Sequence, residues 1–143
     1  MSNARELIII TNTEIARHGI MPAELNDVIR RPQYCELGSP AVPAMEDYAP
    51  VRFPDPAVTA RVHRYKTVAP SELIATITEL RLDVAGNLVG KVNIGSTHPK
   101  SAAVLKAYNR PKCGIKVQPR IGREYWGANN SEAKVFGFDV VFK

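Results

Sequence analysis

The chain has 143 residues, of which 45% are hydrophobic and 23% charged, and its formal net charge is +5. This length predicts one domain with a single core, and the composition is typical of a globular protein. No apolar run is long enough for a membrane span, and the N-terminal apolar run is too short for a signal peptide. Two cysteines do not make a disulfide framework and the three histidines lack ligand spacing, so we expect no metal or cofactor.

The charge is unevenly distributed along the chain. Residues 1–60 hold five Lys or Arg against eight Asp or Glu, whereas residues 91–143 hold ten against three. Residues 91–123 contain eight basic side chains and no acidic one. A basic segment of this kind can face nucleic acid or an acidic protein surface, and a solvated basic face is an equal alternative. No nucleic-acid-binding motif accompanies it.

The first part of the chain predicts a strand, a helix and a long proline-rich stretch. Residues 6–11 form an apolar β-like run, and residues 22–30 place apolar side chains at helical spacing after a first-turn proline. Residues 35–56 contain recurrent prolines and are expected to lack regular structure. Within them, residues 40–56 are predicted to be an ordered arm or a long loop, lying either on a neighbouring subunit or on the chain's own core.

The central part predicts three strands and a helix. Strands are expected over residues 58–68, 72–83 and 88–94, and a turn at Ala85-Gly86-Asn87 joins the last two as a hairpin. The helix that follows should be capped by the serine or threonine of Ser96-Thr97. It should stop before Pro111, because the residue before a proline is pushed out of helical geometry.

Two further strands, over residues 113–117 and 133–142, are expected on either side of a polar loop at 122–131. The sum is about six strands and two or three short helices. We therefore predict an α+β fold in a single domain, residues 1–143, with a mainly antiparallel, barrel-like sheet.

The residues themselves offer no assembled active site. A hydrolase needs a nucleophile, a base and an oxyanion site together, and none of the serines lies in a nucleophile elbow. Ser96-Thr97-His98 is explained more simply by a helix cap, and Cys35 and Cys113 by packing in the core. Tyr125 and Trp126 are equally compatible with an interface anchor and with an aromatic pair at the edge of the core.

Six short segments carry a family resemblance through their order and spacing. They are Met21-Pro22-Ala23-Glu24-Leu25, Cys35-Glu36-Leu37-Gly38-Ser39-Pro40, Ile77-Thr78-Glu79-Leu80 with the Gly86 turn, residues 88–105, residues 114–122, and Phe138-Asp139-Val140-Val141. Together they span residues 20–142 and resemble the maturation (prohead) protease of tailed bacteriophages, a serine protease whose barrel resembles that of herpesvirus assemblin. The resemblance implies that fold and a phage-head setting.

The departures from the family fall on its catalytic positions. Its histidine in Glu-Leu-x-His-Pro corresponds to Ser39, and its second histidine falls near Ala75. Its serine pair corresponds to Gln118-Pro119, and the arginine that follows is retained as Arg120. Glutamine and proline supply neither a nucleophile nor a base, so the resemblance implies a scaffold that has lost its chemistry.

The resulting hypothesis is a non-enzymatic head protein that acts as a capsid cementing, decoration or minor component. It would be made in the host cytoplasm and located in the virion, with the major capsid protein and further copies of itself as partners. DNA contact through residues 91–123 is a further option, and no membrane contact is expected. The candidate partner-binding residues are Met45, Tyr48, Phe53, Lys100, Lys106, Arg110, Lys112, Arg120, Arg123, Tyr125 and Trp126.

Two alternatives stay open at this point. One is a maturation protease with relocated catalytic residues, for which Cys113 and His98 are the available nucleophile and base. The other is a regulator that binds the true protease or its scaffold substrate through the inherited groove.

Overall fold

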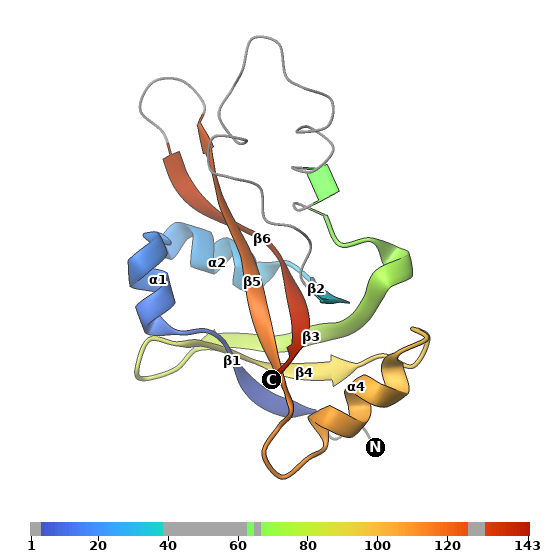
Figure 1. Ribbon diagram of the computed structural model, residues 1–143. Coiled ribbons are helices and arrows are strands. Elements are labelled where there is room, and N and C mark those ends of the chain that lie inside the picture. Colours follow the sequence, from blue (N-terminus) through green and yellow to red (C-terminus); the bar gives the residue numbers. More distant parts are fainter. Residues whose placement is uncertain (1–3, 39–62, 65–66, 126–130) are drawn as a thin grey trace.

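A computed structural model describes residues 4–38, 63–64, 67–125 and 131–143, and these form one curled sheet with helices packed against it (Figure 1). The strands lie in the order β1-β4-β3-β2-β6-β5. They are β1 (Arg5–Ile10), β2 (Gln33–Leu37), β3 (Leu73–Leu82), β4 (Leu88–Ile94), β5 (Ile115–Tyr125) and β6 (Ser131–Phe142). The outermost strands of this order, β1 and β5, also contact each other, so the sheet curls into a half-barrel. The expected α+β class is confirmed.

A short 3-10 turn, η2 (Pro70–Glu72), leads into β3. Three α-helices have both ends within the described residues. They are α1 (Asn12–His18), α2 (Pro22–Arg30) and α4 (Ser101–Tyr108). A reciprocal capping box between Thr11 and Glu14 starts α1. The predicted helix α2 is confirmed, with proline in its first turn, and it buries Leu25 and Val28.

The strand β2 is a correction, because residues from Cys35 onward were expected to lack regular structure. It lies in the middle of the sheet, antiparallel to β3 and parallel to β6. Cys35 and Glu36 are both buried although their side chains point to opposite faces. β2 is stabilised by pairing with a strand on each side and by burial of both of its faces, although its short sequence by itself does not predict a strand.

The strands β5 and β6 are longer than expected, and their pairing includes residues 122–125 and 131 of the predicted loop at 122–131. Pro119 lies within β5, which pairs only with β6 in the strand order. The Lys143 amide donates to the Gly114 carbonyl, so the backbone polar groups of Gly114 face β6. In an antiparallel ladder only every second residue directs these groups to the partner strand. Pro119 is five residues after Gly114, so its nitrogen is directed away from β6. The missing N–H therefore breaks no ladder hydrogen bond.

Two further expectations need correction. Neither Ser96 nor Thr97 caps α4, which begins at Ser101 with Lys100 as its N-cap. The chain makes an extra turn first, in which the Ser101 amide donates to the His98 carbonyl. Of the strand expected over residues 58–68, positions 63 and 64 are helical and positions 67 and 68 are not in a strand, while its other residues and the arm at 40–56 lie outside the described residues.

The hairpin between β3 and β4 is confirmed, with Gly86 at φ 86° in its turn.

The hydrophobic core fills the inside of the curl, and the helices close it. The buried hydrophobic side chains, each at most 2% exposed, include Ile9, Ile10, Val28, Ile74, Leu88, Val92, Val104, Ile115, Phe138 and Val140.

Candidate functional site

The positions that match the family's catalytic residues lie on different strands. Ala75 on β3 pairs with Cys35, Cys35 pairs with Phe138, and Phe138 pairs with Pro119 on β5. Ala75 and Pro119 thus stand in one row across the sheet, with two strands between them. Ala75 is only 1% exposed, and Ser39 lies outside the described residues.

A buried ionic cluster occupies the opposite face of the sheet from this row. Arg120 on β5 donates to Asp139 on β6 from Nε at 3.0 Å and from Nη2 at 2.6 Å. The same Nη2 lies 2.8 Å from Oε2 of Glu36 on β2. All three side chains are at most 2% exposed. The strand register brings these three side chains together. Glu36 pairs with Asp139, and Asp139 pairs with Gln118 on β5. Arg120 lies two residues after Gln118, so its side chain is on the same face of the sheet.

The cluster also fastens the segment that leads into η2. Arg64 donates to both oxygens of Glu36, at 2.9 and 2.7 Å. The Ala69 amide donates to Glu36 Oε1 at 2.6 Å, and Arg120 Nη1 donates to the Thr67 carbonyl at 2.7 Å. These groups converge from three strands and one connecting segment, so the cluster joins parts of the chain that are far apart in sequence.

The two buried carboxylates have opposite pKa shifts. Burial raises the pKa of Asp139, and it outweighs the lowering by the hydrogen bonds and charge of Arg120. Burial would also raise the pKa of Glu36, but hydrogen bonds from two arginines and one backbone amide outweigh it and lower that pKa. Desolvation opposes the charged form of Arg120, but its two carboxylate partners prevail and raise its pKa. The cluster is therefore an ion-pair network that has little contact with solvent.

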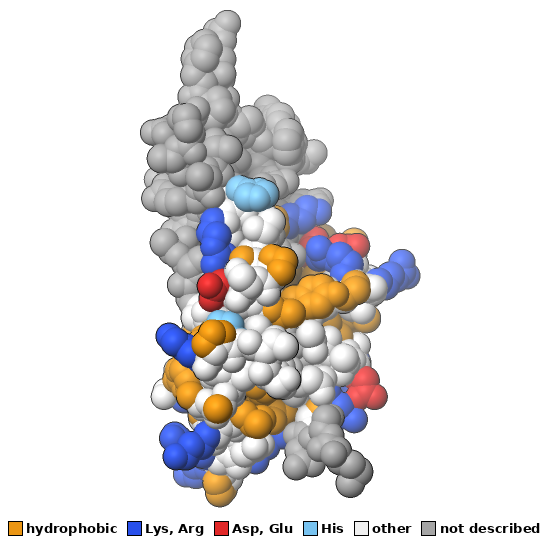
Figure 2. All heavy atoms as spheres, turned by 90° about the vertical axis from the view of Figure 1, so that its right-hand side faces the viewer, with side chains coloured by type: hydrophobic (Ala, Val, Ile, Leu, Met, Phe, Trp, Pro, Cys, Tyr) orange, Lys and Arg blue, Asp and Glu red, His pale blue; other side chains and the backbone are white. Residues whose placement is uncertain are grey.

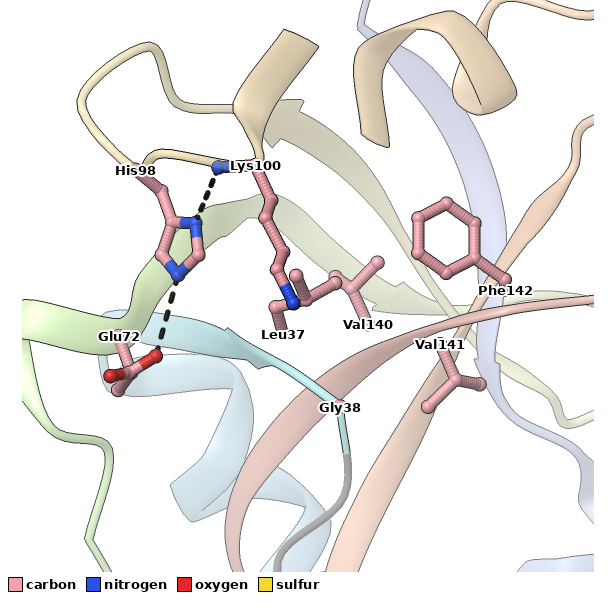
Figure 3. A pocket seen from close by; sticks show the side chains of 8 residues that line it. All are labelled: Leu37, Gly38, Glu72, His98, Lys100, Val140, Val141 and Phe142. Carbon is pink, nitrogen blue, oxygen red and sulfur yellow. Dashed lines mark hydrogen bonds and ion pairs between the residues drawn. The ribbon is translucent and has the colours of Figure 1, made fainter. Parts of the chain in front are cut away.

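A pocket of about 370 Å³ opens where β2 ends (Figure 3). Its lining residues are Leu37, Gly38, Glu72, His98, Lys100, Val140, Val141 and Phe142. Nδ1 of His98 accepts a hydrogen bond from the Lys100 amide at 3.0 Å, so the proton of the neutral ring sits on Nε2. Nε2 lies 3.4 Å from Oε2 of Glu72, and the ring is held between these two neighbours.

The predicted basic residues divide between surface and interior. Lys100, Lys106, Arg110 and Lys112 are exposed around α4. Arg120 is a correction, because its guanidinium is enclosed by the buried cluster and cannot reach a partner on the surface. Figure 2 shows hydrophobic side chains gathered in the middle of one face, with Lys and Arg side chains around them.

The other predicted partner-binding residues lie where the structure gives no side-chain description. They are Met45, Tyr48, Phe53, Arg123, Tyr125 and Trp126.

The proposed rescue pair is not assembled by direct contact. Cys113 is half-buried, and its Sγ lies 3.5 Å from the Ile115 carbonyl oxygen. His98 is held by Glu72 and by the Lys100 amide, and no hydrogen bond joins it to Cys113 within the described residues. Both thiols are free.

Glu36, Asp139 and Arg64 were not predicted from the sequence as members of a site. A signal existed for Asp139, which is the only charged residue in the otherwise apolar run at residues 135–142. A charge in such a position must find a partner when the strand is buried. The sequence does not indicate that Arg120 is the partner of both Glu36 and Asp139.

In the described parts of the chain, no group of three or more His, Cys, Asp and Glu side chains is arranged to hold a metal ion. The described helices are also too short or too polar to span a membrane. No protein-family model, no curated protein and no solved structure matches this chain.

Proposed function

We propose that this chain is a non-enzymatic structural protein of a tailed-phage head, a cementing, decoration or minor capsid component built on a degenerate prohead-protease-like barrel. The observation that carries the proposal is the environment of the family's serine pair. There β5 has Gln118 and Pro119, and the retained Arg120 forms ion pairs with two buried carboxylates. The polar groups at this point of the scaffold hold strands together and have little contact with solvent, which suits a structural role.

The curled α+β sheet is compatible with the barrel that the resemblance implies. Exposed basic side chains, Lys106, Arg110 and Lys112, follow one another along and just after α4. They suit an acidic partner such as a capsid surface or packaged DNA. Because a phage head is a symmetric assembly, many copies of a weak contact would act together.

The first test is a mass-spectrometric inventory of purified mature virions and empty proheads, with copy number relative to the major capsid protein. A structural head protein should be present in mature particles at tens to hundreds of copies, as expected for a component that follows capsid symmetry. Absence from virions, together with failure to bind purified capsids, would overturn the proposal.

A capsid-binding assay tests the basic surface separately. The triple variant Lys106→Gln, Arg110→Gln and Lys112→Gln should bind capsids more weakly than the unmodified chain, and the difference should shrink at high salt. Lys91→Gln is the matched control, because Lys91 is exposed and already paired with Glu79 on the sheet at 2.8 Å. Equal loss in both variants would mean that the α4 surface is not the contact.

A maturation protease with relocated residues is the second candidate, and the His98–Glu72 pair beside a pocket is the observation in its favour. Among the described residues that line the pocket there is no serine, threonine or cysteine, which counts against this candidate. Processing of scaffold or capsid protein should disappear in Cys113→Ser or His98→Gln if this candidate is right. A regulator of the true protease would instead co-purify with that protease or its scaffold from infected cells.

A further inference from the structure

We propose that the pocket beyond the end of β2 binds the C-terminal end of an extended apolar peptide, with the terminal carboxylate held by Lys100. This inference does not depend on the phage-head proposal. It rests on an interrupted strand position in the sheet, on the apolar walls of the pocket, and on a cation directed into it.

The interrupted strand position comes from the unequal lengths of β2 and β6. The last pair of this parallel ladder is Leu37 with Val140, and the Gly38 amide donates to the Val140 carbonyl at 2.8 Å. β6 continues to Phe142, whereas β2 has already ended. Strand alternation turns the N–H and carbonyl of Phe142 to the same side as those of Val140. Among the described residues, no backbone group of β2 reaches them.

An extended peptide at this position could therefore use backbone hydrogen bonds that the described residues leave unmade. Strand addition of this kind supplies affinity through main-chain groups and specificity through side-chain contacts. Phe142 is the last residue of β6, so only a short stretch of peptide can pair with this strand beyond Val140. A pocket of about 370 Å³ is at the small end of the usual range for ligand sites.

The walls favour an apolar ligand. Leu37, Val140, Val141 and Phe142 line one part of the pocket, and the Phe142 side chain is 52% exposed. A large aromatic side chain at the rim of a pocket can cover an aliphatic ligand and remove its surface from water.

The charge favours a carboxylate. The Lys100 side chain runs from the start of α4 into the pocket, with its ammonium beside Leu37 (Figure 3). Within the described parts of the chain, no carboxylate lies within ion-pair distance of this ammonium. Glu72, the acidic residue of the lining, is directed to the His98 ring instead. A peptide carboxylate would supply the missing partner for Lys100.

The test is a nuclear magnetic resonance titration of the purified full chain, followed through its backbone amides. The probe is acetyl-Ala-Val-Val-Leu with a free carboxylate, and the comparison probe is the same peptide with an amidated C-terminus. The free acid should shift the amides of Gly38, Lys100 and Phe142, with weak affinity in the range of about 0.1–1 mM. Amidation should weaken binding about fivefold to tenfold, because it removes the charge that pairs with Lys100.

Variants separate the pocket from the general basic surface. Lys100→Gln should weaken binding of the free acid by about fivefold to tenfold and abolish its preference over the amide. Lys106→Gln is the matched control, since it removes an exposed lysine of α4 that does not line the pocket. It should change the affinity less than about twofold.

Three results would overturn the inference. The first is equal binding of the free acid and the amide. The second is a titration in which the amides of Gly38 and Phe142 do not shift, or in which no amide shifts at about 5 mM peptide, well above the expected dissociation constant. The third is a Phe142 amide that shifts with protein concentration and not with peptide, which would assign the pocket to contact between copies. Because purified protein is used, failure here leaves the virion inventory unaffected, and the converse also holds.

Discussion

Arg120 and Asp139 form a two-point ion pair between β5 and β6, with N–O distances of 3.0 and 2.6 Å, and both are 1% exposed. Two parallel N–H donors that meet one carboxylate fix both the distance and the orientation of the strands. Glu36 binds the same guanidinium from β2, so these three residues act as one unit. Such a unit contributes mainly by specifying which strands meet, because burying the charges offsets much of their attraction.

Removing one charge from this unit should be costly. We expect Glu36→Gln to lower the free energy of unfolding at neutral pH by about 3–5 kcal/mol, since it leaves the buried Arg120 with one of its two carboxylate partners. Urea denaturation measures the change. The matched control is Asp27→Asn, because Asp27 pairs with Arg31 on the surface and is 60% exposed. The two variants should differ clearly, and similar unfolding midpoints would contradict a structural role for the cluster.

The cluster also predicts how stability depends on pH. Hydrogen bonds lower the pKa of Glu36 in the folded chain from its ordinary value of 4.5, despite the opposing effect of burial. Its contribution is therefore fully present above about pH 4.5 and is lost as the pH falls through the lowered folded pKa. Glu36→Gln should flatten the decline of stability in this acidic range. Unfolding curves recorded from about pH 6 to pH 2.5 would measure it.

Asp139 should act in the opposite direction and at higher pH. Its folded pKa is raised above the ordinary value of 3.8 by burial, so the folded chain binds the extra proton first. Stability from this group is present below about pH 3.8 and is lost as the pH rises through the raised folded pKa. If Glu36→Gln and Asp139→Asn left the same pH profile, the opposite assignment of the two shifts would be wrong.

Tyr108 should be a strong point of attachment for α4. Its hydroxyl donates to the Val92 carbonyl on β4 at 2.7 Å and accepts a hydrogen bond from the Arg5 amide of β1. Tyr108→Phe leaves both backbone groups without this partner, and we expect a loss of about 1–3 kcal/mol in thermal or chemical unfolding. Tyr34→Phe removes a hydroxyl from a side chain that is 47% exposed and should have little effect. Comparable losses would show that the attachment does not matter.

The two cysteines should react very differently with a thiol reagent. Cys35 is 0% exposed, and burial together with the nearby Asp139 charge raises its pKa, so both access and thiolate formation are blocked. Cys113 is only half-buried. In the native chain we expect one reactive thiol, which Cys113→Ser removes, and a second only after unfolding. Two thiols that react at one rate in the native chain would place Cys35 within reach of solvent.

Local patterns in the sequence determined much of the fold. The helix at residues 22–30, the hairpin turn at Gly86 and the strand at residues 88–94 were all predicted with their bounds or close to them. Each depends on interactions between near neighbours, such as a proline in the first helical turn or a glycine at positive φ. The end of α4 before Pro111 is of the same kind.

Only the tertiary structure decided what requires pairing between distant segments. The central place of β2, the length of β5 through Pro119, and the burial of Arg120 all depend on which strand lies beside which. The sequence marked Arg120 as one basic residue among eight, because the charge of a side chain does not indicate whether it faces solvent. Its carboxylate partners are 84 and 19 residues away in the chain, and strand pairing alone brings them within hydrogen-bond distance.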